Sequence, residues 1–369
     1  MRPILITICV LANIAFFTGC VGNKSSASDV SSYTFKRGVN ISHWLSQNYG
    51  DRTYAAPWFT QADVAWIADQ GFDHIRVPID SKHWMTSEGA LIESAIEPFA
   101  RACEWAQAHN LGVILDVHYL PGASFSTVEN ELFTNEALIV VAENFWAQLA
   151  ERYADAGSWL RFELINEPVA ERNAQLNPLL ARLLAAVRAT NPTRVVYFTS
   201  NKWGQFNTVT DLELPDDPNV ALTVHFYKPF PFTHQRAAWT DFKPPMPQVD
   251  FPGIVPDITN LVPKGHPWAL LSGTTINTEI SVDPKFKKLA KWAKENAPDL
   301  EIHIGEFGVY EAASPQSIQN YVGAVVAASE RHGFGWAIWD YCGGFAIRDS
   351  KGQPTAAMRG INLGIEAAR

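Results

Sequence analysis

Eight short apolar segments alternate with helical patterns along most of this chain. Each segment has the length of a strand that is buried on both faces, and the stretches between them repeat apolar residues at helical spacing. Alternation of this kind predicts a parallel α/β fold, and eight strands close a (β/α)8 barrel, or TIM barrel. The expected strands are residues 37–40, 72–77, 112–117, 160–165, 194–198, 220–224, 301–305 and 335–339. The expected helices are residues 61–70, 96–109, 135–153, 179–190, 283–296 and 315–332.

The start of the chain does not continue this pattern. Met1 and Arg2 give a positively charged beginning, and the apolar run over residues 4–17 is too short to span a membrane. The run leads into Phe17-Thr18-Gly19-Cys20, which resembles a bacterial lipoprotein signal, in which the cysteine is lipidated and becomes the new N-terminus. An ordinary signal peptide and an uncleaved anchor are the alternatives.

Three segments follow from this interpretation. We expect a lipoprotein signal peptide over residues 1–19, a flexible tether over residues 20–32 that begins with the lipidated Cys20, and a single barrel domain over residues 33–369. The protein would then be an exported lipoprotein of the outer membrane, the periplasm or the cell surface of a bacterium, in contact with a membrane only through its lipid. Val21 carries no acidic retention signal, which favours the outer membrane.

Charge and composition exclude some classes of partner. The formal net charge is −9, so no basic face is available for nucleic acid. No spacing of cysteine and histidine suggests zinc, and we expect no metal, no cofactor and a monomer. Cys103 and Cys342 are expected to be free thiols, with one disulfide as the alternative. The 13 Trp, 10 Tyr and 21 Phe residues, although most belong to a core, offer flat faces on which sugar rings can stack.

Polar residues recur at the C-terminal ends of the expected strands, where the loops of such a barrel gather the chemistry. Each of them has an ordinary structural explanation, but together they predict one site. A segment over residues 228–281, rich in Pro, Phe and Trp, follows the sixth strand and is expected to be a long functional loop on the same face. The polar residues are Arg76, His118, Asn166, Glu167, His225, Tyr227 and Glu306, and Trp339 ends the eighth strand.

Two of these residues, Glu167 and Glu306, follow the fourth and seventh strands, on opposite sides of the expected barrel. Hydrolysis of a glycosidic bond uses such a pair. One carboxylic acid protonates the leaving oxygen, and the other carboxylate attacks the anomeric carbon or activates water. Strands on opposite sides of a barrel can bring the two groups to the short separation of direct attack, which predicts retention of configuration.

The motifs around these glutamates are similar to those of glycoside hydrolase family 5, the cellulase family of the large clan of retaining barrels. Asn166-Glu167-Pro168 follows one apolar strand, and Gly305-Glu306-Phe307 follows a later one. The likeness covers most of the chain from Tyr33 onward. The other matching motifs are Arg37-Gly38-Val39-Asn40, Ile75-Arg76-Val77-Pro78, Asp116-Val117-His118, His225-Phe226-Tyr227 and Trp336-Ala337-Ile338-Trp339.

The resemblance implies a role for each matching residue. Glu167 would be the general acid/base, and Glu306 would be the nucleophile that forms a glycosyl-enzyme intermediate. Asn166 would bind the 2-hydroxyl of the sugar. Arg76 would lie close to Glu306 and keep it ionised.

The remaining residues would orient the nucleophile or line the cleft. Tyr227 would donate a hydrogen bond to Glu306, and His118 and His225 would bind sugar hydroxyls or tune the acid. Trp339 would form the floor on which the sugar at the cleavage point stacks. Weaker candidates for substrate contact, for which loop packing is an equally good explanation, are His43, Trp44, Tyr119 and Trp203.

The resemblance implies a β-glucan or a related polysaccharide as substrate, with endo-β-1,4-glucanase as the first expectation. Residues 38–44 depart from the commonest openings of bacterial cellulases and resemble the β-1,3-glucanase branch. A β-1,3-glucanase, a β-mannanase or another β-glycanase of the family is therefore the alternative.

Two readings from other classes compete with this one. A metal-dependent barrel hydrolase could use His118, His225, His303 and Glu306, but the His-x-His pair usual after the first strand is missing. A surface lipoprotein that only binds polysaccharide is the non-enzymatic alternative, although it would need no pair of glutamates.

Overall fold

The computed structural model describes residues 33–48, 53–126 and 130–369. The expected signal peptide, the tether and Cys20 lie outside the described residues. Among the described helices, none is both long enough and apolar enough to cross a bilayer.

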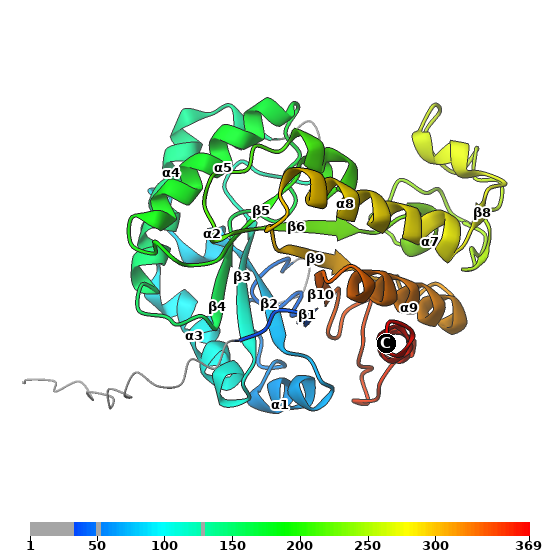
Figure 1. The fold of residues 1–369 in the computed structure, drawn as a ribbon, viewed down its shortest axis with the longest axis horizontal. Coiled ribbons are helices and arrows are strands. Elements are labelled where there is room, and N and C mark those ends of the chain that lie inside the picture. Colours follow the sequence, from blue (N-terminus) through cyan, green and yellow to red (C-terminus); the bar gives the residue numbers. More distant parts are fainter. Residues whose placement is uncertain (1–32, 49–52, 127–129) are drawn as a thin grey trace, which may run out of the picture. The chain divides into compact units, whose positions relative to one another are not determined.

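Eight parallel strands close into a barrel in the order β1, β10, β9, β6, β5, β4, β3, β2, with helices between them (Figure 1). The (β/α)8 prediction is therefore confirmed. The barrel strands are β1 (Arg37–Asn40), β2 (His74–Asp80), β3 (Gly112–Tyr119), β4 (Leu160–Glu163), β5 (Val196–Thr199), β6 (Val220–Phe226), β9 (Ile302–Phe307) and β10 (Gly335–Ile338). The helices are α1 (Gln61–Asp69), α2 (Ser81–Trp84), α3 (Glu93–Ala108), α4 (Glu136–Arg152), α5 (Asn173–Arg188), α6 (Asn201–Gly204), α7 (Phe230–Thr233), α8 (Asp283–Asn296), α9 (Pro315–Arg331) and α10 (Ala356–Ala367).

Three of the longer helices differ from the expectation, and the four-residue helices α2, α6 and α7 were not predicted. α3 and α5 begin earlier than predicted, and each contains a proline, Pro98 and Pro178, near its start. Each proline is the sixth residue of its helix and removes one backbone hydrogen bond from the second turn, which weakens the local helical signal. α10 was not expected at all, because Gly360 and Gly364 weaken its helical pattern.

The segment after β6 is more structured than the long loop that the sequence predicts. It contains α7 and a two-stranded antiparallel sheet of β7 (Gly253–Ile254) and β8 (Thr275–Ile276). The buried Gln235 side chain fastens this insertion, because it donates to the Val249 carbonyl at 2.8 Å and accepts from the Val249 amide at 2.9 Å. The insertion is thus a folded unit at the C-terminal end of β6.

Successive side chains along each strand point alternately to the inside and to the outside of the barrel. On β2, Ile75 and Val77 belong to the main apolar core, whereas His74 and Arg76 bond to groups on other barrel strands. A second, smaller apolar cluster contains Ile114 and Tyr197, and the Tyr197 hydroxyl accepts a hydrogen bond from Arg161 at 2.7 Å. Polar side chains are thus already present inside the barrel before the C-terminal ends of the strands, where the site lies.

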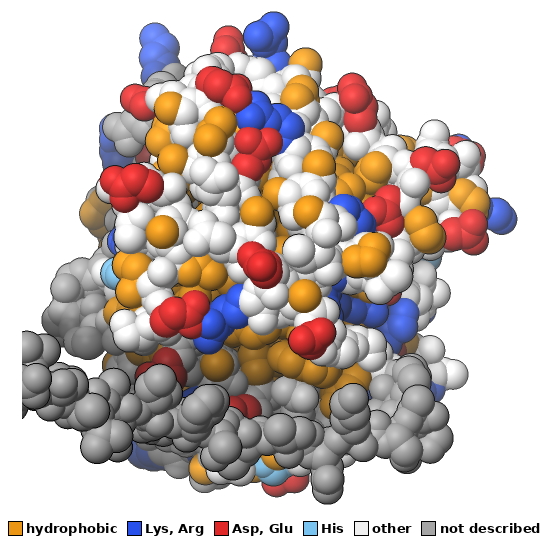
Figure 2. Space-filling view, turned by 90° about the vertical axis from the view of Figure 1, so that its left-hand side faces the viewer, with side chains coloured by type: hydrophobic (Ala, Val, Ile, Leu, Met, Phe, Trp, Pro, Cys, Tyr) orange, Lys and Arg blue, Asp and Glu red, His pale blue; other side chains and the backbone are white. Residues whose placement is uncertain are grey.

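Two expectations from composition concern the surface and the cysteines. On the face seen in Figure 2, acidic and basic side chains are interspersed, and the described part of that face shows no continuous basic surface. Cys103 is buried and Cys342 is exposed, and neither forms a disulfide. The expectation of two thiols is therefore confirmed.

Candidate active site

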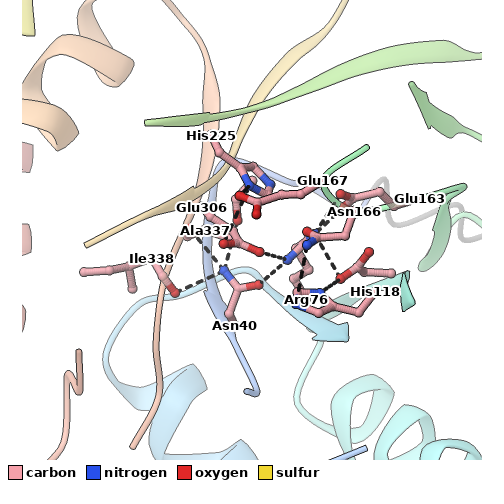
Figure 3. Close-up of polar contacts among 12 residues, drawn as sticks. Asn40, Arg76, His118, Glu163, Asn166, Glu167, His225, Glu306, Ala337 and Ile338 are labelled. Carbon is pink, nitrogen blue, oxygen red and sulfur yellow. Dashed lines mark hydrogen bonds and ion pairs between the residues drawn. The ribbon is translucent and has the colours of Figure 1, made fainter. Parts of the chain in front are cut away.

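Arg76 is the centre of the polar cluster at the C-terminal ends of the strands (Figure 3). Its side chain is 0% exposed, and it donates to both oxygens of Glu163, from Nε at 2.8 Å and from Nη2 at 2.7 Å. Nη2 also lies 3.0 Å from Asp116 Oδ2, and Nη1 lies 2.8 Å from Glu306 Oε1. One buried guanidinium therefore faces three carboxyl groups, and its planar fork holds Glu163 in a bidentate pair.

Two asparagines complete the shell around this guanidinium. Arg76 donates to Asn40 Oδ1 at 2.8 Å and to Asn166 Oδ1 at 2.7 Å. The Asn40 amide nitrogen in turn donates to the Gly305 carbonyl at 2.9 Å, so β1 and β9 are tied together beside the site. A side chain at Gly305 would place its Cβ 2.4 Å from Thr223 Oγ1, and glycine therefore lets β9 approach β6 just before Glu306.

The two glutamates that the sequence singles out lie next to each other. One carboxylate oxygen of Glu167, one of Glu306 and a ring nitrogen of His225 all lie within 4.8 Å of one another. His225 Nδ1 is 2.7 Å from Glu167 Oε1 and 3.6 Å from Glu306 Oε2. The Tyr227 hydroxyl donates to Glu306 Oε2 at 3.0 Å. Glu306 thus receives hydrogen bonds on both oxygens.

The surroundings of the two glutamates decide which of them holds a proton. Burial raises the pKa of Glu167 to about 8, against the attraction of Arg76. Burial also raises the pKa of Glu306 above its ordinary value, opposed by His225 and Arg76. Because Arg76 and Tyr227 both donate to Glu306, a single proton shared by the pair belongs on Glu167.

The histidines of the site are neutral. Burial lowers the pKa of His118 and of His225 to about 4 in each case. His118 Nδ1 lies 2.7 Å from Asp116 Oδ2, whose carboxyl has its pKa raised by burial to about 7. The Asn166 amide nitrogen lies 3.4 Å from His118 Nε2, so His118 helps to orient the amide that stands beside Glu167.

Trp339 lies against the same cluster. Its ring stacks on His118 with centroids 5.6 Å apart and an interplanar angle of 13°. His43 meets Trp339 edge-on at 6.1 Å. The eight principal residues predicted from the sequence are therefore joined by direct contacts, and His43 among the weaker candidates adjoins them.

The other weaker candidates differ in their placement. Tyr119, the last residue of β3, packs edge-on against His118 at 5.7 Å. The indole of Trp203, in α6, donates to the Phe125 carbonyl at 3.1 Å, so both residues lie beside the site. Trp44 is only 3% exposed, its indole donates to the Ala56 carbonyl, and its ring packs on Phe59 at 4.8 Å. The structure thus gives Trp44 a packing role and does not bring it to the glutamates.

Sequence reasoning missed the residues that hold Arg76. Asn40, Asp116 and Glu163 were noted as parts of strands or motifs but not as members of the site. A signal was present, because Arg161 and Glu163 alternate with apolar residues in a strand that is expected to be buried on both faces. Polar residues on one side of such a strand must find partners inside the barrel.

Glu167, His225 and Glu306 are also the three described residues that are spaced closely enough to hold a metal ion. A cation there would compete with Arg76 for Glu306, since the guanidinium already lies 2.8 Å from that carboxylate. His303, which the metal-dependent reading would need, instead bonds to His74 inside the barrel, with their Nε2 atoms 3.0 Å apart. The donor set therefore fits a proton-transfer site better than a resident metal.

Comparison with known proteins finds a matching family and several similar sequences. The family described as "Cellulase (glycosyl hydrolase family 5)" matches residues 35–344. Endoglucanase C of Acetivibrio thermocellus is 29% identical over 318 residues, which span 84% of this chain and 91% of the relative. Cellodextrinase A of Ruminococcus flavefaciens is 25% identical over 300 residues, which span 80% of this chain and 82% of the relative.

Solved structures agree with the sequence relatives. A hyperthermophilic endo-β-1,4-glucanase solved in complex with substrate is 26% identical, with a TM-score of 0.73, and the match covers 89% of this chain and 97% of that one. Another endoglucanase has a TM-score of 0.74 at 26% identity, covering the same shares of the two chains, 89% and 97%. The chain therefore belongs to glycoside hydrolase family 5, the cellulase family, and is a glycoside hydrolase.

Proposed function

We propose that this glycoside hydrolase is a retaining endo-β-1,4-glucanase that uses Glu167 as acid/base and Glu306 as nucleophile. The observation that carries the proposal is the pair of carboxylates whose nearest oxygens lie within 4.8 Å, with the pKa of Glu167 at about 8. Retaining enzymes hold their two carboxyl groups at about 5 Å, whereas inverting enzymes leave room for a water molecule between them.

The reaction then proceeds by double displacement. In the first step an oxygen of Glu306 bonds to the anomeric carbon, the bond to the leaving sugar breaks, and the proton of Glu167 passes to the leaving oxygen. In the second step Glu167, now a carboxylate, takes a proton from water as the water oxygen attacks the same carbon. The bond to Glu306 breaks, and both groups return to their starting states.

The surrounding residues act through these two. Arg76 and Tyr227 keep the negative charge on Glu306 by donating to its two oxygens, at 2.8 and 3.0 Å. Asn166 has its oxygen bonded to Arg76 and one amide hydrogen directed at His118. Its second amide hydrogen is left for the 2-hydroxyl of the sugar, a contact that strengthens in the transition state. Trp339 supplies the flat floor beneath the ring.

Substrate choice rests on the relatives. The relatives are named as endoglucanases and a cellodextrinase, and one of the similar solved structures is named as an endo-β-1,4-glucanase, which supports β-1,4-glucan as the substrate. A β-1,3-glucanase, β-mannanase or other β-glycanase of the family remains the second candidate because of residues 38–44. A protein that only binds polysaccharide would need neither the proton on Glu167 nor the donors on Glu306.

Products made from defined soluble oligosaccharides of β-1,4-glucan, β-1,3-glucan and β-mannan would test the proposal. We expect internal cleavage of β-1,4-glucan, and proton NMR should show the β-anomer as the first product. An α-anomer would contradict the retaining mechanism, and turnover of only another polymer would contradict the substrate. Glu306→Gln should remove nearly all turnover but keep binding, whereas Glu171→Gln, at an exposed position close in sequence to Glu167, should change little.

We also propose that the chain is exported and lipidated at Cys20, with residues 33–369 as the catalytic domain. The support is the sequence alone, in which an apolar run leads into Gly19-Cys20. In a bacterial host, the wild-type protein should sediment with membranes and be released by detergent. Cys20→Ala should lose the lipid and leave the membrane fraction. Equal sedimentation of both proteins would contradict the anchor.

A further inference from the structure

Trp239 stands out among the tryptophans of the chain. All 13 lie within the described residues, and Trp239 alone has an exposed side chain, 63% accessible. The others are buried or half-buried. A large aromatic surface left in water costs free energy unless something covers it, and an indole is well suited to cover the apolar face of another flat group.

The Trp239 ring is held in place although it is exposed. It meets Tyr310 edge-on, with centroids 5.0 Å apart and an interplanar angle of 83°, and it lies 6.4 Å from Phe345. These three aromatic residues, which we call the distal platform, come from the loops after β6, β9 and β10. A platform built from three loops needs those loops to be joined.

Backbone hydrogen bonds supply that joining. The Tyr310 amide donates to the Thr233 carbonyl at 2.8 Å, and the Glu311 amide donates to the Gly344 carbonyl at 2.8 Å. A Cβ at Gly344 would lie 2.6 Å from the Tyr310 ring, so glycine is required for this close approach. The segments after β6, β9 and β10 are thus connected through the backbone at Tyr310 and its neighbour Glu311.

The distal platform is continuous with the catalytic pair. Phe345 is 6% exposed, and its ring lies 5.6 Å from Tyr310 and 6.1 Å from Tyr227. The Tyr227 hydroxyl is the group that donates to Glu306. An unbroken series of aromatic contacts therefore runs from the proposed nucleophile to the exposed indole, at the same end of the barrel.

We propose that Trp239 binds a sugar ring of the β-glucan chain outside the catalytic subsite, so that the insertion after β6 selects for longer substrates. The ligand class is the pyranose ring, whose apolar C–H face stacks on an indole while its hydroxyls stay in water. This inference rests on the proposed function, because it places the same polymer over the catalytic pair and over the distal platform.

Other exposed apolar residues of the insertion provide a contrast. Leu270 is 82% exposed and Ile254 is 64% exposed. Neither is aromatic, so neither offers a flat ring to a sugar. They serve as matched controls, since replacing them removes exposed apolar surface from the same insertion.

The test compares Trp239→Ala, Trp239→Phe and Leu270→Ala on substrates of increasing length. We expect Trp239→Ala to lower kcat/KM on the longest soluble oligosaccharides by about three- to tenfold, mainly through KM. The same variant should leave an aryl disaccharide unaffected, because that substrate is too short to reach the ring. Trp239→Phe should restore most of the loss, and Leu270→Ala should match the wild type. Equal losses on short and long substrates, or no loss on any, would overturn the inference.

A binding experiment separates this inference from the proposed function. Glu306→Gln with and without Trp239→Ala is titrated with long oligosaccharides of glucan and mannan, and affinity is measured by calorimetry. If wild-type enzyme cleaves no β-1,4-glucan, the substrate assignment fails. If the Trp239→Ala form binds the preferred polymer more weakly, that result would still support sugar binding at the distal platform. Equal affinities of the two forms for every polymer would refute sugar binding by Trp239 and leave the proposed function untouched.

Discussion

Arg76 is the residue on which the ionisation of the site depends. It is fully buried and lies within 3.0 Å of oxygens of Asp116, Glu163 and Glu306. Three carboxyl groups cannot all be ionised beside one cation in a buried place, and burial raises the pKa of each of the three. The three groups therefore hold protons to a higher pH than ordinary carboxyl groups do, and the hydrogen bonds from Arg76 and Tyr227 favour Glu306 as an ionised member.

Activity should be lost as pH rises through about 8. Glu167 must be protonated to serve as the acid, and its pKa is raised to about 8 by burial. The value of kcat/KM should therefore fall on the basic side of the profile near pH 8. On the acidic side it should fall as Glu306 becomes protonated, at a pH above the ordinary pKa of a glutamate. An aryl glycoside whose leaving group needs no proton should lose the basic limb of kcat/KM. A basic limb at the same pH on both substrates would assign it to another group.

Arg76→Lys should destabilise the fold and lower kcat. Lysine keeps the charge, but it cannot hold both oxygens of Glu163 and also reach Glu306, as the guanidinium does at 2.7 to 2.8 Å. Breaking a buried ion pair leaves buried charge uncompensated, which costs about 3 kcal/mol. Urea denaturation would measure the loss. Arg182→Lys is the matched control, because Arg182 pairs with two glutamates at the surface and should change stability little. Equal effects of the two substitutions would contradict the argument.

The two glutamates and their direct partners could be predicted because family motifs mark them in the sequence. The groups that surround Arg76 could not be assigned in the same way. Asp116 and Glu163 lie on neighbouring strands, and their Cα atoms are register partners in the β3–β4 pair. The register between two strands is set when the barrel closes in three dimensions. The residue pattern of one strand predicts only which side chains point to the same face of that strand.

At the level of elements, the barrel strands were predicted well because short, mainly apolar segments alternate with helical patterns along the chain. The predicted ends differ from the structure by a few residues; β2, for example, continues to Asp80 instead of ending at Val77. The short strands β7 and β8 in the insertion were not predicted, because two residues carry no periodicity. Those strands depend on contacts within the insertion and not on local propensity.

The last helix, α10, was not predicted because of its two glycines. Its Gly360 and Gly364 reduce helix propensity, yet both lie against α9, the neighbouring helix in Figure 1. A Cβ at Gly360 would lie 2.6 Å from the Gln319 carbonyl oxygen, and one at Gly364 would lie 2.6 Å from the Gly323 carbonyl oxygen. The glycines thus favour close packing of two helices over the stability of one helix alone.

Gly364→Ala should therefore destabilise the protein despite its better helix propensity. The new methyl group would meet backbone and the Val326 side chain, at 2.6 and 2.7 Å, and overpacking of this kind costs about 1–3 kcal/mol. Asn362→Ala, on the exposed face of the same helix, adds propensity without a clash and should leave stability unchanged or slightly higher. Urea denaturation of both variants would decide. A Gly364→Ala protein as stable as the wild type would show that the two helices can move apart at no cost.

At the scale of the whole molecule, buried titratable groups lower the stability of the fold both in acid and at higher pH. Burial lowers the pKa of His118 and His225 to about 4 and that of His234 to about 3. Below their ordinary value of 6.5 the unfolded chain takes up protons that the folded chain refuses, so acid destabilises the fold. Buried carboxyl groups act in the opposite direction at higher pH.

Stability should decrease as pH rises from about 6.5 to about 8.5. With pKa values raised to about 8 for Glu167 and about 7 for Asp116, the folded chain still holds protons that the unfolded chain has released. The free energy of unfolding then falls with pH, by up to about 1.4 kcal/mol per pH unit for each such group. Calorimetric Tm across this range would measure the slope, and Glu167→Gln, which cannot release a proton, should flatten it. A Tm that climbs steadily through the same range, or a slope that Glu167→Gln leaves unchanged, would mean that Glu167 is already ionised at neutral pH and cannot be the acid.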